Sequence, residues 1–278
     1  MFLLQPFHYE FFRNGILAAT MIGALTGLIG VFIILRKMSY IGHGLSHAIF
    51  GGAVVSYVMQ WNFYIGAGIW GFISALLIAS LARRHKIGTD AAIGIVTTAS
   101  FAVGVGIISR VRHFTKNFEA ALFGNVLAVT PEDLLVIFIV AIVTGFVIFF
   151  TYKKLLFLTF DQEVAKAYRV PVTLIDTLFS LILAATIIAS VQVMGVTLIA
   201  ASVVIPASIA RLLTNSFSRM LLLSTLIGAL CGFFGLYLSF YFDISSGATI
   251  VILSALLFAI VSIIKTSNLR YLSEKNSF

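Results

Sequence analysis

The sequence is dominated by apolar runs of about 20 residues that recur along its whole length. A helix needs a run of this length to cross the roughly 30 Å hydrocarbon core of a bilayer. Only 10% of the residues are charged, whereas soluble domains carry about 25%. A membrane β-barrel is excluded because its strands would alternate over about 10 residues. The sequence therefore predicts an all-α, polytopic membrane bundle.

Eight or nine membrane-spanning helices are predicted, and one membrane domain fills residues 1–278. The segment 195–213 is the least regular of the nine, because Pro206 interrupts it and could break the helix. The predicted spans are 15–35, 40–60, 63–82, 91–109, 133–152, 173–192, 195–213, 219–241 and 246–264.

Basic residues gather in alternate loops and predict the orientation. If the N-terminus lies outside, only Arg13, Arg110, Arg112 and Lys116 of the 18 lysines and arginines fall outside. Cytoplasmic loops are enriched in Lys and Arg, so we expect the N-terminus outside and the C-terminus in the cytoplasm. The net charge of +8 follows from this loop pattern, and no nucleic-acid partner is expected.

Two histidines interrupt the second predicted span. His43 and His47 are four residues apart, so a helix places them on one face. Imidazoles are common ligands of first-row metals, and ionisable groups at membrane depth usually mark function. The pair could contact a metal ion or form hydrogen bonds between helices. The single cysteine, Cys231, excludes a cysteine-rich metal site.

The loop 153–172 is expected to contain a short helix over 162–169. Asp161 is its predicted N-cap, and Pro171 follows its end. This helix is too short and polar to span the membrane. It could lie on the membrane surface, in contact with lipid, or it could contact a cytoplasmic partner.

Acidic residues stand near the ends of several predicted spans. The segment Thr-Pro-Glu-Asp at 130–133 is typical of a helix start, and Asp176 is interpreted as another helix-start acid. Asp243 lies at the predicted outer end of the eighth span. It could attract cations at an outer entrance, or it could cap the turn that follows.

Five segments, in order along the chain, resemble the zinc, manganese and iron family of ABC transporter permeases. The match at 122–134 is closest in appearance to zinc-uptake permeases. The five segments are RKMSYIGHGLSHAIFGG (36–52), LFGNVLAVTPEDL (122–134), DQEVAKAYRVPV (161–172), MGVTLIAASVVIPASIARLL (194–213) and FYFDISSGATIVIL (240–253).

The resemblance implies a transport subunit of an importer in the bacterial plasma membrane. It implies a second permease copy, a cytoplasmic ATPase and an extracellular or periplasmic metal-binding protein as partners. The sequence has no G-x-x-x-x-G-K-[ST], so ATP hydrolysis is expected on the separate ATPase. The chain itself is therefore not expected to be an enzyme, and no permanently bound cofactor is expected. The resemblance assigns ATPase coupling to Asp161, Gln162, Glu163, Ala165 and Lys166.

Two positions depart from the pattern of the family that the chain resembles. That family usually has aspartate where His43 stands, and often glycine where Arg169 stands. A pair of imidazoles favours zinc, whereas oxygen ligands suit manganese better. We therefore expect His43 and His47 to contact transported Zn²⁺, with Mn²⁺ as the next choice.

Three other functions would each need features that differ from those of this sequence. A membrane metalloprotease would need H-E-x-x-H, and this chain has H-G-L-S-H at 43–47 without the glutamate base. A metal carrier driven by an ion gradient usually has several acids within its spans, and here most acids lie in loops or near span ends. A permease for a metal chelate would need a larger, more aromatic pocket.

Overall fold

The computed structural model describes residues 2–83, 88–110, 124 and 126–275, and the side chains of these residues except 2, 3, 127 and 268–275. No strand occurs within these ranges. The chain forms the elements η1 (Phe2–His8), α1 (Glu10–Leu35), α2 (Ile41–Val58), α3 (Phe63–Ala82), α4 (Thr89–Ile108), η2 (Val126–Ala128), α6 (Pro131–Phe160), α7 (Gln162–Ala167), α8 (Val172–Met194), α9 (Ile199–Leu213), α10 (Phe217–Phe242) and α11 (Ser246–Lys275).

The predicted membrane bundle is confirmed, and each of the nine predicted spans coincides with a helix. Seven of the described helices are long and apolar enough to cross a membrane. The other two are α2, which carries the histidine pair, and α9, which has only 15 residues. The expected break at Pro206 is wrong, because α9 continues through this residue. The helix instead begins at Ile199 and not at the predicted position 195, because it follows a turn in which Gly195 adopts a φ of 77°.

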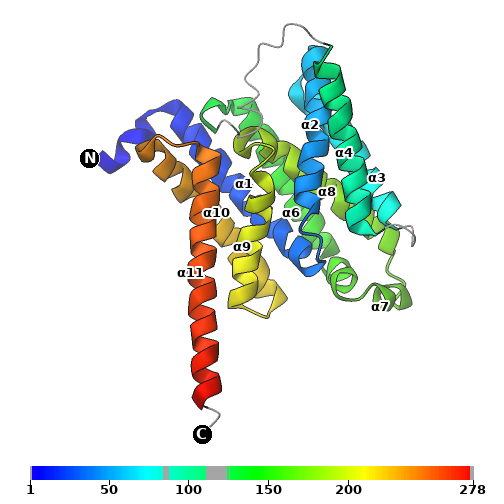
Figure 1. Cartoon of the computed structure of the whole chain (residues 1–278), viewed down its shortest axis with the longest axis vertical. Helices are drawn as coiled ribbons and strands as arrows, with labels where there is room; N and C mark the ends of the chain where they lie inside the picture. Colours follow the sequence, from blue (N-terminus) through cyan, green and yellow to red (C-terminus); the bar gives the residue numbers. More distant parts are fainter. Residues whose placement is uncertain (1, 84–87, 111–123, 125, 276–278) are drawn as a thin grey trace.

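Helix α1 lies at the centre of the bundle and packs closely against α10 (Figure 1). Gly23 faces the backbone of Gly228, and Gly27 faces the backbone of Ser224. The Ser224 hydroxyl donates a hydrogen bond to the Gly27 carbonyl oxygen at 2.5 Å. Small residues let two membrane helices approach closely, so this contact anchors the fold.

Helices α2, α3 and α4 form a second group that packs against α8 and α9 (Figure 1). Glycines again set the spacing. A Cβ on Gly44 would meet Ile93 and Thr97 of α4, and one on Gly51 would meet the Ser100 carbonyl oxygen at 2.6 Å. Helix α2 is therefore held tightly against α4.

Helix α6 begins as the sequence predicts. The Thr130 hydroxyl accepts a hydrogen bond from the Asp133 N–H, and the Asp133 carboxylate accepts one from the Thr130 N–H. The Tyr64 hydroxyl of α3 also donates to Asp133, at 2.7 Å. Two of the basic residues that predict the orientation, Arg112 and Lys116, lie outside the described residues. So does the first part of segment 122–134.

Candidate metal site and coupling segment

The histidine pair lies in the first two turns of α2. The ring centroids of His43 and His47 are 4.3 Å apart, so the predicted shared face is confirmed. His47 also lies beside Phe101 of α4, with 5.7 Å between ring centroids. The two imidazoles therefore stand in a row along one side of α2.

One ring nitrogen of His47 has no partner among the described residues. Its Nδ1 atom is buried and lacks a hydrogen bond within the described part of the chain. Buried polar atoms are nearly always hydrogen-bonded, and a hydrogen bond between helices was the alternative to metal contact. No such bond forms at Nδ1 within the described residues, so the alternative has no support at this atom.

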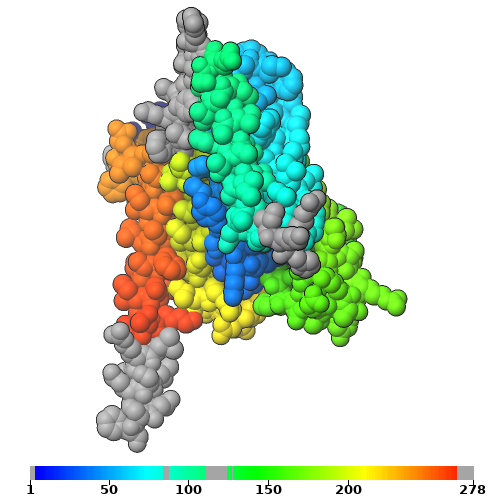
Figure 2. All heavy atoms as spheres, turned by 45° about the vertical axis from the view of Figure 1, so that its right-hand side comes forward, coloured from blue at the N-terminus to red at the C-terminus, as the bar shows by residue number. Residues whose placement is uncertain are grey.

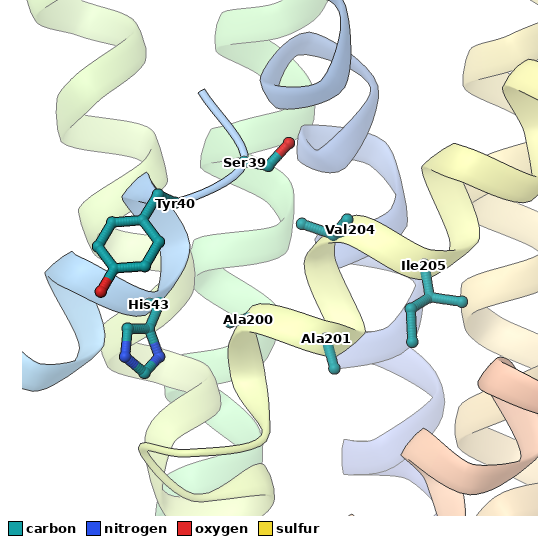
Figure 3. A pocket seen from close by; sticks show the side chains of 7 residues that line it. All are labelled: Ser39, Tyr40, His43, Ala200, Ala201, Val204 and Ile205. Carbon is teal, nitrogen blue, oxygen red and sulfur yellow. The ribbon is translucent and has the colours of Figure 1, made fainter. Parts of the chain in front are cut away.

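His43 lines an open pocket of about 490 Å³ between the start of α2 and one side of α9 (Figure 3). Tyr40 lies over the His43 ring, with 5.3 Å between centroids. Figure 2 shows that α2 reaches the molecular surface between α4 and α9. An ion or a second protein chain could therefore approach His43 from this face. The pocket is lined by Ser39, Tyr40, His43, Ala200, Ala201, Val204 and Ile205.

Ser46 fixes the histidine helix to the turn before α9. Its buried hydroxyl is 2.9 Å from the Val196 carbonyl oxygen and 2.9 Å from that of His43. Val196 follows Gly195 in the turn that leads into α9. This hydrogen bond connects α2 directly to the turn before α9, the two elements that enclose the pocket.

The described residues contain no group of three or more His, Cys, Asp or Glu side chains that could hold a metal ion. One chain therefore offers two imidazoles without a third strong side-chain ligand in those ranges. Structural zinc sites use four fixed ligands. The sparse arrangement suits an ion that must bind and then leave.

The predicted short helix after α6 is present as α7. Asp161 caps it by accepting hydrogen bonds from the N–H groups of Glu163 and Val164, at 2.9 and 3.0 Å. Lys166 pairs with Glu163 at 3.1 Å. Of the five residues assigned to coupling, Ala165 is buried and the other four, Asp161, Gln162, Glu163 and Lys166, are exposed.

Helix α7 ends at Ala167, two residues before the predicted end at 169. Arg169 adopts a φ of 56°, the left-handed region that glycine occupies at little cost. This backbone explains why the pattern that the chain resembles often has glycine there. Tyr168, just before it, is 72% exposed and stacks on Phe157 of α6.

Asp243 forms the end of α10. It is exposed, adopts a left-handed φ of 52°, and its N–H donates to the Ser239 carbonyl oxygen. The interpretation as a turn residue is confirmed by this geometry. Its expected part in an outer ion entrance stays a prediction.

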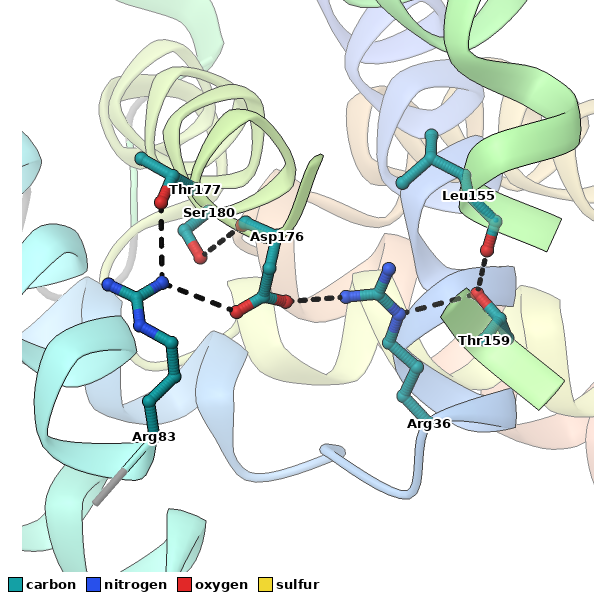
Figure 4. Close-up of polar contacts among 7 residues, drawn as sticks. All are labelled: Arg36, Arg83, Leu155, Thr159, Asp176, Thr177 and Ser180. Carbon is teal, nitrogen blue, oxygen red and sulfur yellow. Dashed lines mark hydrogen bonds and ion pairs between the residues drawn. The ribbon is translucent and has the colours of Figure 1, made fainter. Parts of the chain in front are cut away.

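Asp176 does more than begin a helix, and the sequence interpretation missed this. Its carboxylate pairs with Arg36 and Arg83, which come from the ends of α1 and α3 (Figure 4). Arg36 is 140 positions from Asp176 in sequence. No local motif could have revealed a contact over that separation.

This fold is that of a polytopic helical membrane protein, and comparison with known proteins gives its family. The model of the ABC 3 transport family matches residues 8–265, so the chain belongs to this family. Together with the seven long apolar helices among the described residues, the family places the chain as a multi-pass protein of the bacterial plasma membrane.

Individual relatives and one solved structure agree with this assignment. The manganese transport system membrane protein MntC of Halalkalibacterium halodurans is 38% identical and aligns over 93% of this chain and 89% of its own. The chelated iron transport system membrane protein YfeC of Yersinia pestis is 33% identical over 92% and 87%. A chain of PsaBC from Streptococcus pneumoniae in complex with Fab superposes with a TM-score of 0.82, at 33% identity, over 93% and 92%.

The relatives do not support the expected preference for zinc. Manganese and chelated iron stand in the names of these two proteins, and zinc stands in neither. The membership in a metal-transport permease family agrees with the resemblance found in the sequence.

Proposed function

We propose that this chain is the membrane subunit of an ABC importer for Mn²⁺, and that His43 and His47 contact the ion during transport. The observation that carries the proposal is the pair itself. Two imidazoles stand together on a helix. One lines an open pocket, and the other has a buried nitrogen without a partner in the described part of the chain. Manganese, as the ion, is supported by the name of the MntC relative.

The assembly that we propose has the partners of an ABC importer. A cytoplasmic ATPase would contact α7, an extracellular metal-binding protein would deliver the ion, and a second copy of the chain would complete the pocket. The N-terminus would lie outside. The ends of α1, α3 and α6 meet the start of α8 on one side of the bundle. The excess of Lys and Arg in the loops on that side supports its assignment as the cytoplasmic side.

The ligand chemistry and the relatives point to different ions. Imidazoles bind zinc more tightly than manganese, since manganese stands lowest in the affinity order of divalent first-row metals. A transport site must release its ion, so weak binding of manganese is compatible with import. Zinc would then enter the same site and inhibit manganese uptake.

Reconstitution in proteoliposomes tests the proposal. The permease, its ATPase and its binding protein would be combined, and uptake of Mn²⁺ would be measured with ATP, without ATP, and with an imposed proton or sodium gradient alone. We expect uptake only with ATP. Uptake driven by a gradient without ATP would identify a secondary carrier and contradict the proposal.

A metal chelate is the second candidate cargo. The pocket of about 490 Å³ falls within the range of small-molecule sites, roughly 300–1,000 Å³, and the YfeC relative carries chelated iron in its name. Apart from His43 itself, Tyr40 is the one aromatic side chain among the seven described lining residues, which favours a bare ion. Uptake of a chelate in preference to free Mn²⁺ would support this second candidate.

Replacing His43 with aspartate is expected to change metal preference. A carboxylate is a harder ligand than imidazole, so zinc should inhibit manganese uptake about tenfold less while manganese uptake continues. The measurement is the zinc concentration that halves Mn²⁺ uptake by the full complex. The matched control is His8→Asp, at an exposed histidine outside the pair. An unchanged zinc inhibition in His43→Asp would contradict a direct contact between His43 and the ion.

Removing the cap of α7 is expected to weaken ATPase binding. Asp161→Ala leaves two N–H groups uncapped and costs about 1 kcal/mol of helix stability. Because the ATPase would have to order the frayed helix, its affinity should fall about fivefold. Asp161→Asn is the control, since asparagine caps helices equally well. Binding of detergent-solubilised permease to immobilised ATPase measures this, and equal affinities of the two variants would argue against docking at α7.

A further inference from the structure

Two arginines share one carboxylate near the short helix α7, which we propose contacts the ATPase. The Asp176 Oδ1 atom lies 3.1 Å from Arg36 Nη1, and its Oδ2 atom lies 3.8 Å from Arg83 Nη1 (Figure 4). Arg36 follows the last residue of α1, Arg83 follows that of α3, and Asp176 belongs to the second turn of α8. Three helices are therefore joined at a single side chain.

Arg36 is the buried centre of this cluster. Its side chain is only 7% exposed, and its guanidinium lies 4.3 Å from the centre of the Phe179 ring. A buried charge without a partner is costly, and Asp176 is the partner that the structure provides. The Arg36 Nη2 atom is buried and has no hydrogen bond to any described residue, and Asp176 supplies the negative charge that offsets the burial of this cation.

Arg36 also contacts the other end of the coupling segment. Its Nε atom donates a hydrogen bond to the Thr159 hydroxyl at 3.3 Å. Thr159 belongs to the last turn of α6, just before α7, and Asp176 belongs to α8, just after α7. One guanidinium thus holds both ends of the segment that contains α7.

The histidine helix begins immediately after Arg36. Lys37 makes a left-handed turn with a φ of 56°, and the Met38 N–H bonds back to the Ile33 carbonyl oxygen at 3.0 Å. Helix α2 starts at Ile41, and His43 lies in its first turn. The connection between the guanidinium and the histidine pair is therefore short and internally bonded.

We propose that Arg36 and Asp176 are positioning residues that transmit movement of α7 to the histidine pair. When the ATPase moves α7, the ends of α6 and α8 move with it, and the shared guanidinium pulls the start of α2. The opening or closing of the site around His43 is thereby linked to ATP hydrolysis. This inference rests on the proposed function, because it needs an ATPase at α7 and an ion at the pair.

The test measures the ratio of manganese ions transported to ATP molecules hydrolysed, in proteoliposomes that contain the full complex with its binding protein. Asp176→Asn keeps the shape of the side chain and removes its charge. We expect ATP hydrolysis to continue and the ratio to fall about tenfold, a coupling loss within the usual range for linked sites. Asp90→Asn is the control, because Asp90 is an exposed acid at the start of α4, and its ratio should equal that of the wild type.

A second, milder variant tests the same cluster in case Asp176→Asn fails to fold. Thr159→Val removes only the hydroxyl that binds Arg36, and the ratio should fall about threefold. A purely structural cluster would lower transport and hydrolysis together and leave the ratio at the wild-type value in both variants, which would overturn the inference. A wild-type complex that takes up no manganese would instead count against the proposed function.

Discussion

Replacing His47 with alanine is expected to lower ATP-driven manganese uptake at least about 100-fold. Loss of a residue that merely supports a metal ligand costs 10- to 100-fold, and a direct ligand should reach the upper end. His47 supplies the buried Nδ1 atom that has no partner in the described residues. The measurement is the initial rate of Mn²⁺ uptake into proteoliposomes at low manganese concentration.

The control for this variant is His8→Ala. His8 is exposed at the end of η1, away from the pair, so its loss should leave the uptake rate within twofold of the wild type, about the scatter of such comparisons. The His47→Ala complex must also bind its ATPase normally, because the change lies in α2 and not in α7. Normal Mn²⁺ uptake by a folded His47→Ala complex would contradict contact between His47 and the transported ion.

The second large effect is expected from a glycine in the central helix contact. Gly23→Ala places a methyl group against the carbonyl oxygen of Gly228. Backbone atoms of two packed helices cannot yield as a flexible side chain does, so the variant should lose about 3 kcal/mol of stability, the upper part of the range for overpacking. Unfolding of the purified permease in mixed detergent, followed by circular dichroism, measures the loss.

Gly145→Ala is the matched control for this prediction. Gly145 lies within α6, and a Cβ there would meet nothing within 4 Å. Alanine is the better helix former by about 1 kcal/mol, so the control should be unchanged or slightly more stable. Equal stability of Gly23→Ala and Gly145→Ala would show that α1 and α10 do not pack as closely as the structure places them.

Features governed by neighbouring residues could be predicted from the sequence. Apolar length placed a helix at each predicted span, and the helix period placed His43 and His47 on one face. The caps at Thr130 and Asp161 also formed as expected, because a cap depends on atoms only two or three residues away. The length of α9 was overestimated, since hydropathy does not register the turn at Gly195.

Features governed by distant contacts could not be predicted. The Arg36–Asp176 pair joins α1 to α8, and Asp176 taken alone looks like an ordinary helix-start acid. The pocket wall formed by α9 offers only apolar and small side chains to His43, so no motif marks it. The transported ion could not be predicted from the residues near the site either. Two imidazoles favour zinc, whereas the names of the relatives give manganese and chelated iron.

The proposed function depends above all on contact between the histidine pair and the ion. Pulsed electron paramagnetic resonance of Mn²⁺ bound to the permease–ATPase complex measures this contact through the magnetic coupling of the metal to imidazole nitrogen. We predict a nitrogen coupling in the wild type that is lost in His43→Ala/His47→Ala and retained in His8→Ala. A wild-type complex that binds Mn²⁺ stoichiometrically without any histidine nitrogen coupling would contradict the claim.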